Sequence, residues 1–222
     1  MPGPGDHPGD GPSLTDQLHV STHPLVREKV TRLRDERTSP PEFRRLVHEI
    51  ALLVLYEATA DFPTVPADVR TPLAPYTGVR LAQTVGLVPV LRAGIGMVEA
   101  ALQLIPEAQV WHIGLFRDEH TLRPIEYYNK LPSSATAQVC LVLDPMLATG
   151  GSSVATIEIL KRWGARSVKY VGLIAAPEGV KALNDAHPDV PIHVASLDER
   201  LNDKGYILPG LGDAGDRQFG TS

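Results

Sequence analysis

The chain has 222 residues, enough for one ordinary domain with a substantial hydrophobic core. Hydrophobic residues make up 43% and charged residues 21%, a globular composition that excludes an intrinsically disordered chain. The net charge of -5 argues against a nucleic-acid binder, and no apolar run is long enough to span a membrane. The single cysteine, Cys140, excludes a disulfide framework and a thiolate zinc site, and without a signal-peptide pattern it predicts a cytoplasmic protein.

The N-terminal region divides into a tail and helices. Eight of the first twelve residues are glycine or proline, so we expect residues 1–22 to be a disordered tail and residues 23–222 to form a single domain. After a short first helix, apolar residues at helical spacing predict a longer helix from Ser39 to about Ala60. Ser39 with Glu42 three residues later has the pattern of a capping box.

Beyond a proline-rich connection at residues 61–76, continuous apolar runs alternate with helical segments. The predicted strands cover residues 86–91, 110–116, 138–143, 168–174 and 192–195. The predicted helices between them cover residues 95–105, 152–163 and 178–187. Uninterrupted apolar strands alternating with helices predict an α/β fold, with a central parallel sheet flanked by helices on both faces. Residues 117–134 are too long for a simple connection, and we expect them to form a protruding arm.

The segment after strand 138–143 carries the clearest chemistry. The strand delivers Asp144 into a loop, and the sequence Thr149-Gly150-Gly151-Ser152 then opens a helix. Glycines let the backbone approach an anion closely, and the free N–H groups at a helix start attract phosphate. Asp144 can accept hydrogen bonds from ribose hydroxyls. The unit therefore predicts a site for a ribose and its 5′-phosphate, although an ordinary tight turn remains the alternative.

Two arginines follow the ends of predicted strands. Arg92 comes directly after strand 86–91, and Arg117 comes after strand 110–116. In parallel sheets ligands bind beyond the carboxyl ends of the strands, where a guanidinium can clamp pyrophosphate oxygens with two donors. A surface salt bridge is the alternative interpretation of each arginine.

Other nucleotide motifs are absent or weak. A Walker A loop needs a lysine after its glycines, and none follows Gly150 or Gly151. Gly94 and Gly96 begin like a dinucleotide fingerprint, but Glu99 occupies the third glycine position. A dinucleotide-binding oxidoreductase is therefore only a weak alternative.

Five segments in order resemble the type I phosphoribosyltransferases and, more narrowly, the uracil phosphoribosyltransferases. These segments are 88–94, 114–119, 126–132, 144–152 and 205–217. The resemblance implies a type I phosphoribosyltransferase fold with a protruding β-arm and a C-terminal hood. It implies that uracil displaces pyrophosphate from phosphoribosyl diphosphate (PRPP) to give UMP in pyrimidine salvage. It also implies Mg²⁺ on the PRPP phosphates and an oxocarbenium-like transition state.

The resemblance also implies roles for individual residues. The implied PRPP-binding residues are Arg92, Arg117, Asp144, Pro145, Met146, Leu147, Ala148, Thr149, Gly150, Gly151, Ser152 and Asp213. The implied uracil-binding residues, in a recognition loop at about 201–221, are Tyr206, Ile207, Gly212, Asp213 and Ala214. The implied catalytic residues are Asp213, Arg92 and Arg117, with Asp213 also near the metal through PRPP or water. Backbone C=O and N–H groups of a glycine-rich loop can match the edge of uracil, but an ordinary C-terminal turn is the alternative.

One departure, two expected partners and one alternative function remain. Many type I members carry a second acid where this chain has Pro145, which puts a two-acid ribose clamp in doubt. The arm, with Tyr127 and Tyr128, predicts a homo-oligomer, dimeric or tetrameric. The cations Arg27, Lys29, Arg32, Arg34 and Arg37 form either a solvated helix face or a site for an activating GTP. A PRPP-sensing regulator without turnover is the alternative to an enzyme.

Overall fold

The structure, a computed structural model, describes residues 16–117 and 124–221. The strands are β1 (Leu18–Val20), β2 (Thr64–Arg70), β3 (Pro75–Leu81), β4 (Val85–Pro89), β5 (Gln109–Val110), β6 (Ile113–Arg117), β7 (Pro124–Asn129), β8 (Val139–Leu143), β9 (Met146–Leu147), β10 (Ser167–Ala175), β11 (Ile192–Leu197), β12 (Arg200–Leu201) and β13 (Ile207–Leu208). The helices are α1 (Pro24–Arg34), α2 (Pro40–Ala58), α3 (Ile95–Leu104), α4 (Gly151–Trp163), α5 (Pro177–Ala186) and α6 (Ala214–Phe219).

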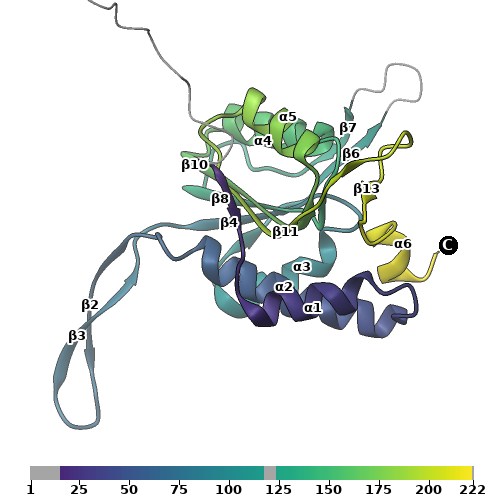
Figure 1. The fold of residues 1–222 in the computed structure, drawn as a ribbon. Coiled ribbons are helices and arrows are strands. Elements are labelled where there is room, and N and C mark those ends of the chain that lie inside the picture. Colours follow the sequence, from purple (N-terminus) through teal and green to yellow (C-terminus); the bar gives the residue numbers. More distant parts are fainter. Residues whose placement is uncertain (1–15, 118–123, 222) are drawn as a thin grey trace, which may run out of the picture.

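A parallel sheet forms the centre of the molecule, in the order β1-β11-β10-β8-β4-β5, with β9 paired to β10. Helices α4 and α5 cover one face, and α1, α2 and α3 cover the other (Figure 1). Because both faces are covered, β4 and β8 are buried along their whole length. The predicted α/β fold with a central parallel sheet is confirmed.

Two hydrophobic cores lie on the two faces of the sheet. Leu141 of β8 packs in the core formed with α1, α2 and α3, whereas Val142 packs in the core formed with α4 and α5. Cys140 belongs to the second core and is fully buried. Burial raises the pKa of its thiol to about 12, so the thiol stays protonated and unreactive at neutral pH.

The predicted boundary between tail and domain at residue 23 was wrong. Leu18–Val20 forms β1, which pairs in parallel with β11. The pairing is flanked by hydrogen bonds from the N–H of Ile192 to the carbonyl of Gln17 and from the N–H of Ser21 to the carbonyl of Val194. A free sheet edge recruits this strand, and three residues are too few to show a periodicity in sequence. Residues 1–15 of the predicted tail lie outside the described residues.

The proline-rich connection is also not a loop. β2 and β3 pair along seven residues in an antiparallel hairpin that projects far from the sheet (Figure 1). Both strands of an isolated hairpin are edge strands, so they tolerate Pro66 and Pro75. A second hairpin, β6–β7, reaches into the predicted arm, because β7 lies within residues 117–134. Its first strand, β6, belongs to the segment predicted as a strand of the parallel sheet at residues 110–116, and it pairs antiparallel with β7 instead. Residues 118–123 of the arm lie outside the described residues.

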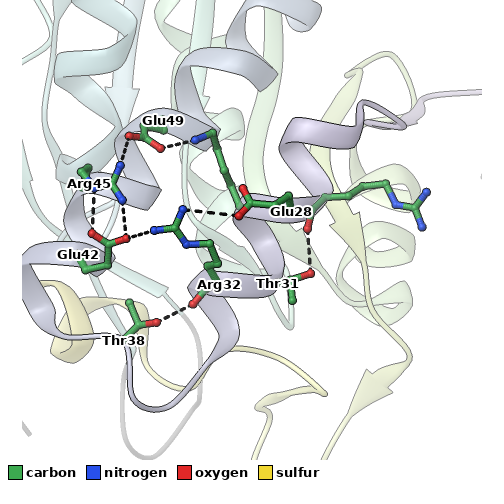
Figure 2. A network of polar contacts seen from close by, with 9 residues as sticks. Glu28, Thr31, Arg32, Thr38, Glu42, Arg45 and Glu49 are labelled. Carbon is green, nitrogen blue, oxygen red and sulfur yellow. Dashed lines mark hydrogen bonds and ion pairs between the residues drawn. The ribbon is translucent and has the colours of Figure 1, made fainter.

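Ser39 begins α2 as predicted, but the capping box does not form. Its side chain makes no capping hydrogen bond. Glu42 instead pairs with Arg32 of α1 and Arg45 of α2, as Figure 2 shows. The neighbouring cations therefore take the carboxylate that a capping box needs.

Candidate active site

The site lies where the chain changes direction across the sheet. After β4 the chain continues to β5 on one side, and after β8 it continues to β10 on the other. β4 and β8 are neighbours, with Pro89 opposite Leu143 at their carboxyl ends. Loops that diverge from adjacent strands leave a crevice between them, which is where ligands bind in open α/β sheets.

A cleft of about 250 Å³ opens at this point. Its lining consists of Val90, Leu91, Arg92, Ala93, Asp144, Met146, Ser152, Asp213 and Gly215. Three segments that are distant in sequence thus meet: the loop after β4, the loop after β8 and the start of α6. Five predicted site residues share this space, namely Arg92, Asp144, Met146, Ser152 and Asp213.

The loop between β9 and α4 has the form of an anion site. Gly150 precedes α4 with a positive φ of 81°, and no side chain caps the helix start. The backbone N–H groups at Gly151 and Ser152, which are exposed residues, therefore face solvent without a capping partner. Pro145 and Leu147, two of the predicted PRPP-binding residues, are buried. Their side chains therefore pack beneath the loop and do not face a ligand.

Gly179 of α5 is a supporting residue that the sequence analysis missed. A Cβ added there would lie 2.3 Å from the carbonyl oxygen of Ala148 and 2.7 Å from that of Leu147. Only glycine allows the first turn of α5 to press against this loop. In the sequence it is an unremarkable helical glycine, and no local pattern identifies it.

Asp144 lies at the base of the cleft. Burial raises the pKa of its carboxyl to about 7, although hydrogen bonds from the N–H of Met146 and the hydroxyl of Ser153 oppose the increase. Ser153, which follows Ser152 at the start of α4, is 2% exposed, so its hydroxyl serves Asp144 and is not available to a phosphate. A carboxyl with this pKa changes charge near neutral pH, which is typical of functional sites.

Arg92 reaches across the cleft to the C-terminal segment. Its Nη2 lies 3.2 Å from Oδ1 of Asp216, and its side chain is 61% exposed. Hydrogen bonds from Thr221 and Arg92 lower the pKa of Asp216. The guanidinium is therefore accessible to a ligand and already oriented toward α6. Arg117, the other predicted arginine, ends β6, but its side chain lies outside the described residues.

The C-terminal segment forms a hood beside the loop between β9 and α4, which is called the phosphate loop below after its predicted ligand. β12 and β13 pair in a short hairpin, and the N–H of Leu201 donates to Oε1 of Glu178 at 3.0 Å, which ties the hood to α5. A Cβ added at Gly205 would lie 3.7 Å from Cγ2 of Thr149. Tyr206 is 48% exposed beside this contact, whereas Ile207 is buried. The hood and the phosphate loop are thus direct neighbours.

Asp213 is both a cleft residue and a helix cap. Its Oδ1 accepts a hydrogen bond of 2.9 Å from the N–H of Asp216 at the start of α6. It also lines a second opening of about 370 Å³, together with Gly212 and Arg217. Ala214, the first residue of α6, is fully buried beneath it. The predicted uracil-binding residues therefore lie on one segment that runs from the residue before β13 to the start of α6.

The glycines of the weak dinucleotide pattern have a packing role. A Cβ added at Gly96 would lie 1.8 Å from Oε1 of Gln218, and Nε2 of Gln218 donates to the carbonyl of Ala93 at 3.0 Å. Gly94 is pressed against the carbonyl of Leu143. These contacts close the hood onto the loop after β4, which disfavours the oxidoreductase alternative.

Four of the five cations in the basic run, which extends from α1 to Arg37, form ion pairs within the chain, and Figure 2 shows those of Arg32. The ion pairs join Lys29 to Glu49, Arg32 to Glu28 and Glu42, Arg34 to Asp198, and Arg37 to Asp35. A helix face with its charges satisfied in this way has little net attraction for a polyanion. The part of the chain that the structure describes contains no cluster of three metal-ligating side chains, and none of its helices is long and apolar enough to cross a membrane.

Known proteins similar to this chain agree with the arrangement. The family model for uracil phosphoribosyltransferase matches residues 20–221. A uracil phosphoribosyltransferase of Roseiflexus castenholzii is 61% identical over 92% of this chain and 99% of its own, and that of Geobacillus kaustophilus is 55% identical over the same shares.

Solved structures agree as well. The AQ2163 protein of Aquifex aeolicus superposes with a TM-score of 0.85 at 42% identity, covering 92% of this chain and 99% of that chain. A hypoxanthine phosphoribosyltransferase of Staphylococcus aureus superposes with a TM-score of 0.51 at 13% identity, over 82% of this chain and 84% of that one, which concerns the fold alone. Since the family match and these relatives extend over almost the entire described chain, the chain belongs to the uracil phosphoribosyltransferase family and has the type I phosphoribosyltransferase fold.

Proposed function

We infer that this chain transfers the phosphoribosyl group of PRPP to uracil, giving UMP and pyrophosphate in pyrimidine salvage. The observation that carries this function is the cleft between β4 and β8, where Arg92, Asp144 and the uncapped start of α4 share one space beside the hood. Its three kinds of group match the diphosphate, the ribose hydroxyls and the 5′-phosphate of PRPP.

Each group has a distinct task in the proposed reaction. The N–H groups at Gly151 and Ser152 hold the 5′-phosphate, and the carboxylate of Asp144 accepts hydrogen bonds from the ribose hydroxyls. The bond from C1′ to pyrophosphate breaks as the bond to N1 of uracil forms. Negative charge then develops on the leaving group, where Arg92 offsets it. Arg117 is proposed to act with Arg92 on the pyrophosphate.

The hood supplies the proposed uracil site. Uracil carries an N–H donor flanked by two carbonyl acceptors, and backbone groups of Ile207, Gly212 and Ala214 can present the complementary pattern. Tyr206 would close the pocket around the ring. Cytosine has the opposite pattern at two of these positions, so a site of fixed backbone groups rejects it.

Mg²⁺ fits this cleft as a substrate-bound ion. Asp213 lines the cleft with a carboxylate, the kind of oxygen that Mg²⁺ prefers, but one carboxylate alone does not make a complete site. The phosphates of PRPP would supply the remaining oxygens, and the ion would neutralise charge on the leaving pyrophosphate. Asp213 would act on the ion through PRPP or water.

The direct test is UMP formation from labelled uracil, PRPP and Mg²⁺, with cytosine, adenine and orotate in parallel. Among these four bases, we expect only uracil to be converted, and we expect this turnover to be lost when Mg²⁺ is chelated. PRPP binding without UMP formation would favour the alternative of a regulator, and no turnover with uracil would contradict the enzyme.

Self-association and GTP are the less direct parts of the proposal. We propose that β2–β3, and not the β6–β7 arm with Tyr127 and Tyr128, joins the subunits of a dimer or tetramer, because Leu73 is 97% exposed and Val79 71% exposed on it. Sedimentation should give a multiple of 24.0 kDa, and a monomer would contradict this. An activating GTP at the basic run would compete with its ion pairs, so initial rates with and without GTP test that site. A cytoplasmic location remains a prediction.

The raised pKa of Asp144 makes PRPP binding pH-dependent. The carboxylate accepts from both ribose hydroxyls more strongly than the protonated acid does, so the KM for PRPP should fall about tenfold between pH 6 and pH 8. The native carboxyl has a pKa of about 7 against 3.8 ordinarily, so its contribution to stability is complete below pH 3.8 and is lost as the pH rises from there through 7. Asp144→Asn should therefore be more stable than the unaltered chain at pH 8, because the amide carries no charge to bury.

Kinetics and urea unfolding of both proteins across this pH range are the measurement. The variant itself is the control, because its KM for PRPP should be high and should follow only the ionisation of the substrate. An equal pH dependence in both proteins would show that Asp144 does not titrate in the binding step.

A further inference from the structure

An ion pair joins the end of α1 to the end of β11. Nη1 of Arg34 lies 2.7 Å from Oδ2 of Asp198, and Nη2 contacts Oδ1. Nη2 also donates to the hydroxyl of Ser196 at 3.0 Å. The side chain of Asp198 is 1% exposed and that of Arg34 is 21% exposed. A charge this deeply buried is tolerated only when its hydrogen-bonding partners are complete.

The hydroxyl of Ser196 also donates to Oδ1 of Asp198 at 3.2 Å, and the backbone of the hood supplies the further partners. The N–H of Gly210 donates to Oδ2 of Asp198 at 2.9 Å, and the carbonyl of Gly210 accepts from Nη1 of Arg34 at 2.8 Å. Both polar groups of one peptide position are therefore held by the two members of the same ion pair. Gly210 has a φ of 65°, and a Cβ there would lie 2.0 Å from the carbonyl oxygen of Ile207. The turn is thus tightly folded at the point where the pair grips it.

Arg217 fixes the next residue from the other side. Its Nη1 donates to the carbonyls of Leu211 at 2.8 Å and Leu33 at 2.9 Å, and its guanidinium lies 4.5 Å from the ring of Phe43. The carbonyls of Gly210 and Leu211 are consequently both anchored to the end of α1. Gly212, a proposed uracil contact, follows directly.

We propose that Arg34 and Asp198 are positioning residues that set the geometry of the uracil-recognition turn through Gly210. This role rests on the proposed uracil site in the hood. Neither side chain lines the cleft that holds Arg92 and Asp144, so the pair acts on the base side of the reaction and not on the PRPP side. Arg34 therefore has a task distinct from the effector site considered for the basic run.

Lys29 provides a matched control on the same helix. It is 20% exposed, close to the 21% of Arg34, and it pairs with Glu49 of α2. Glu49 lies in the helical layer and not in the hood. Both Lys29→Gln and Arg34→Gln remove a largely buried cation from an ion pair, so effects of that loss alone should appear in both variants. Loosening of the turn should appear only in Arg34→Gln.

The experiment compares steady-state kinetics of Arg34→Gln, Asp198→Asn, the double variant and Lys29→Gln. We expect Arg34→Gln to raise the KM for uracil roughly tenfold or more, with the KM for PRPP within about twofold. The double variant should recover part of the loss, because two neutral amides can bond to each other and leave no unpaired charge. All assays omit GTP, so that the basic run is not tested as an effector site, and Lys29→Gln should then change neither KM. If Arg34→Gln does not fold, Arg34→Lys takes its place. It should raise the KM for uracil more weakly, again without changing the KM for PRPP, because lysine keeps the charge but lacks the two parallel donors of the guanidinium.

Equal rises in both KM values, or an unchanged KM for uracil in folded Arg34→Gln, would overturn the proposal, as would an equal effect of Lys29→Gln. Amide hydrogen exchange of residues 208–212 provides a readout without turnover. Exchange should be faster in Arg34→Gln than in Lys29→Gln. Equal rates would contradict the clamp, which is the hold of the Arg34–Asp198 pair on Gly210. A chain that shows this difference but never converts uracil would contradict the proposed function and leave the clamp intact.

Discussion

Gly179→Ala should lower kcat/KM for PRPP by about 100-fold, because the new methyl group collides with backbone that cannot move away freely. The added Cβ would meet the carbonyl oxygens of Ala148 and Leu147 at 2.3 and 2.7 Å. Relief of these contacts displaces the phosphate loop, and a shift near 1 Å in a site of this kind costs about two orders of magnitude. Steady-state kinetics with varied PRPP measure the effect.

The change in the free energy of unfolding of Gly179→Ala shows which of two opposing effects is larger, helix propensity or the collision. Helix propensity alone would make alanine at this position in α5 more stabilising than glycine, by about 1 kcal/mol. The collision should outweigh that gain and destabilise the fold by about 1–3 kcal/mol in urea unfolding. Gly151→Ala is the stability control, since a Cβ there meets nothing closer than 4.0 Å. If Gly179→Ala kept full stability and activity, the prediction would be wrong, because the loop at Leu147 and Ala148 would then move aside without cost.

Arg92→Gln should reduce kcat/KM for PRPP by about 100- to 1000-fold with little change in stability. Loss of a charged donor at a developing anion has effects of this size. The ion pair to Asp216 is 61% exposed on the arginine side, and pairs so exposed add little to folding. Thermal unfolding and steady-state kinetics on one preparation measure both quantities.

Arg162→Gln is a matched control for this variant. Arg162 is 69% exposed and pairs with Glu158 at 3.6 Å near the far end of α4, away from the cleft. It should behave like the unaltered chain in both measurements. A loss of activity in Arg92→Gln that Arg162→Gln shares would point to net charge and not to a pyrophosphate contact.

The sheet could be predicted from the sequence because its strands are local apolar runs. β4 and β8 are buried on both faces, and that burial is already apparent in uninterrupted hydrophobic residues. β1 could not be predicted, since its three residues are defined by pairing with Ile192–Leu197, far along the chain. β2 and β3 were concealed by prolines that only a hairpin with two edges accepts.

The same distinction applies to the candidate site. Arg92, Asp144 and Ser152 could be placed together because strand order brings their loops to one crevice. Gly179 and Asp198 could not, since the first acts by lacking a side chain and the second by bonding to a distant backbone. The burial of Ser153 likewise follows from packing and not from its place beside two glycines.

The two cores separate the foundations of the two proposed subsites. The apolar residues of the hood, Ile207, Leu211 and Ala214, pack with the layer of α1, α2 and α3. The helices that begin at and support the phosphate loop pack with the opposite layer through Ile157 and Val180. The sheet stands between these layers as a partition, so cavity-forming substitutions on one side should weaken recognition of the base and those on the other recognition of PRPP. The enzyme can in this way vary its two affinities independently within one domain.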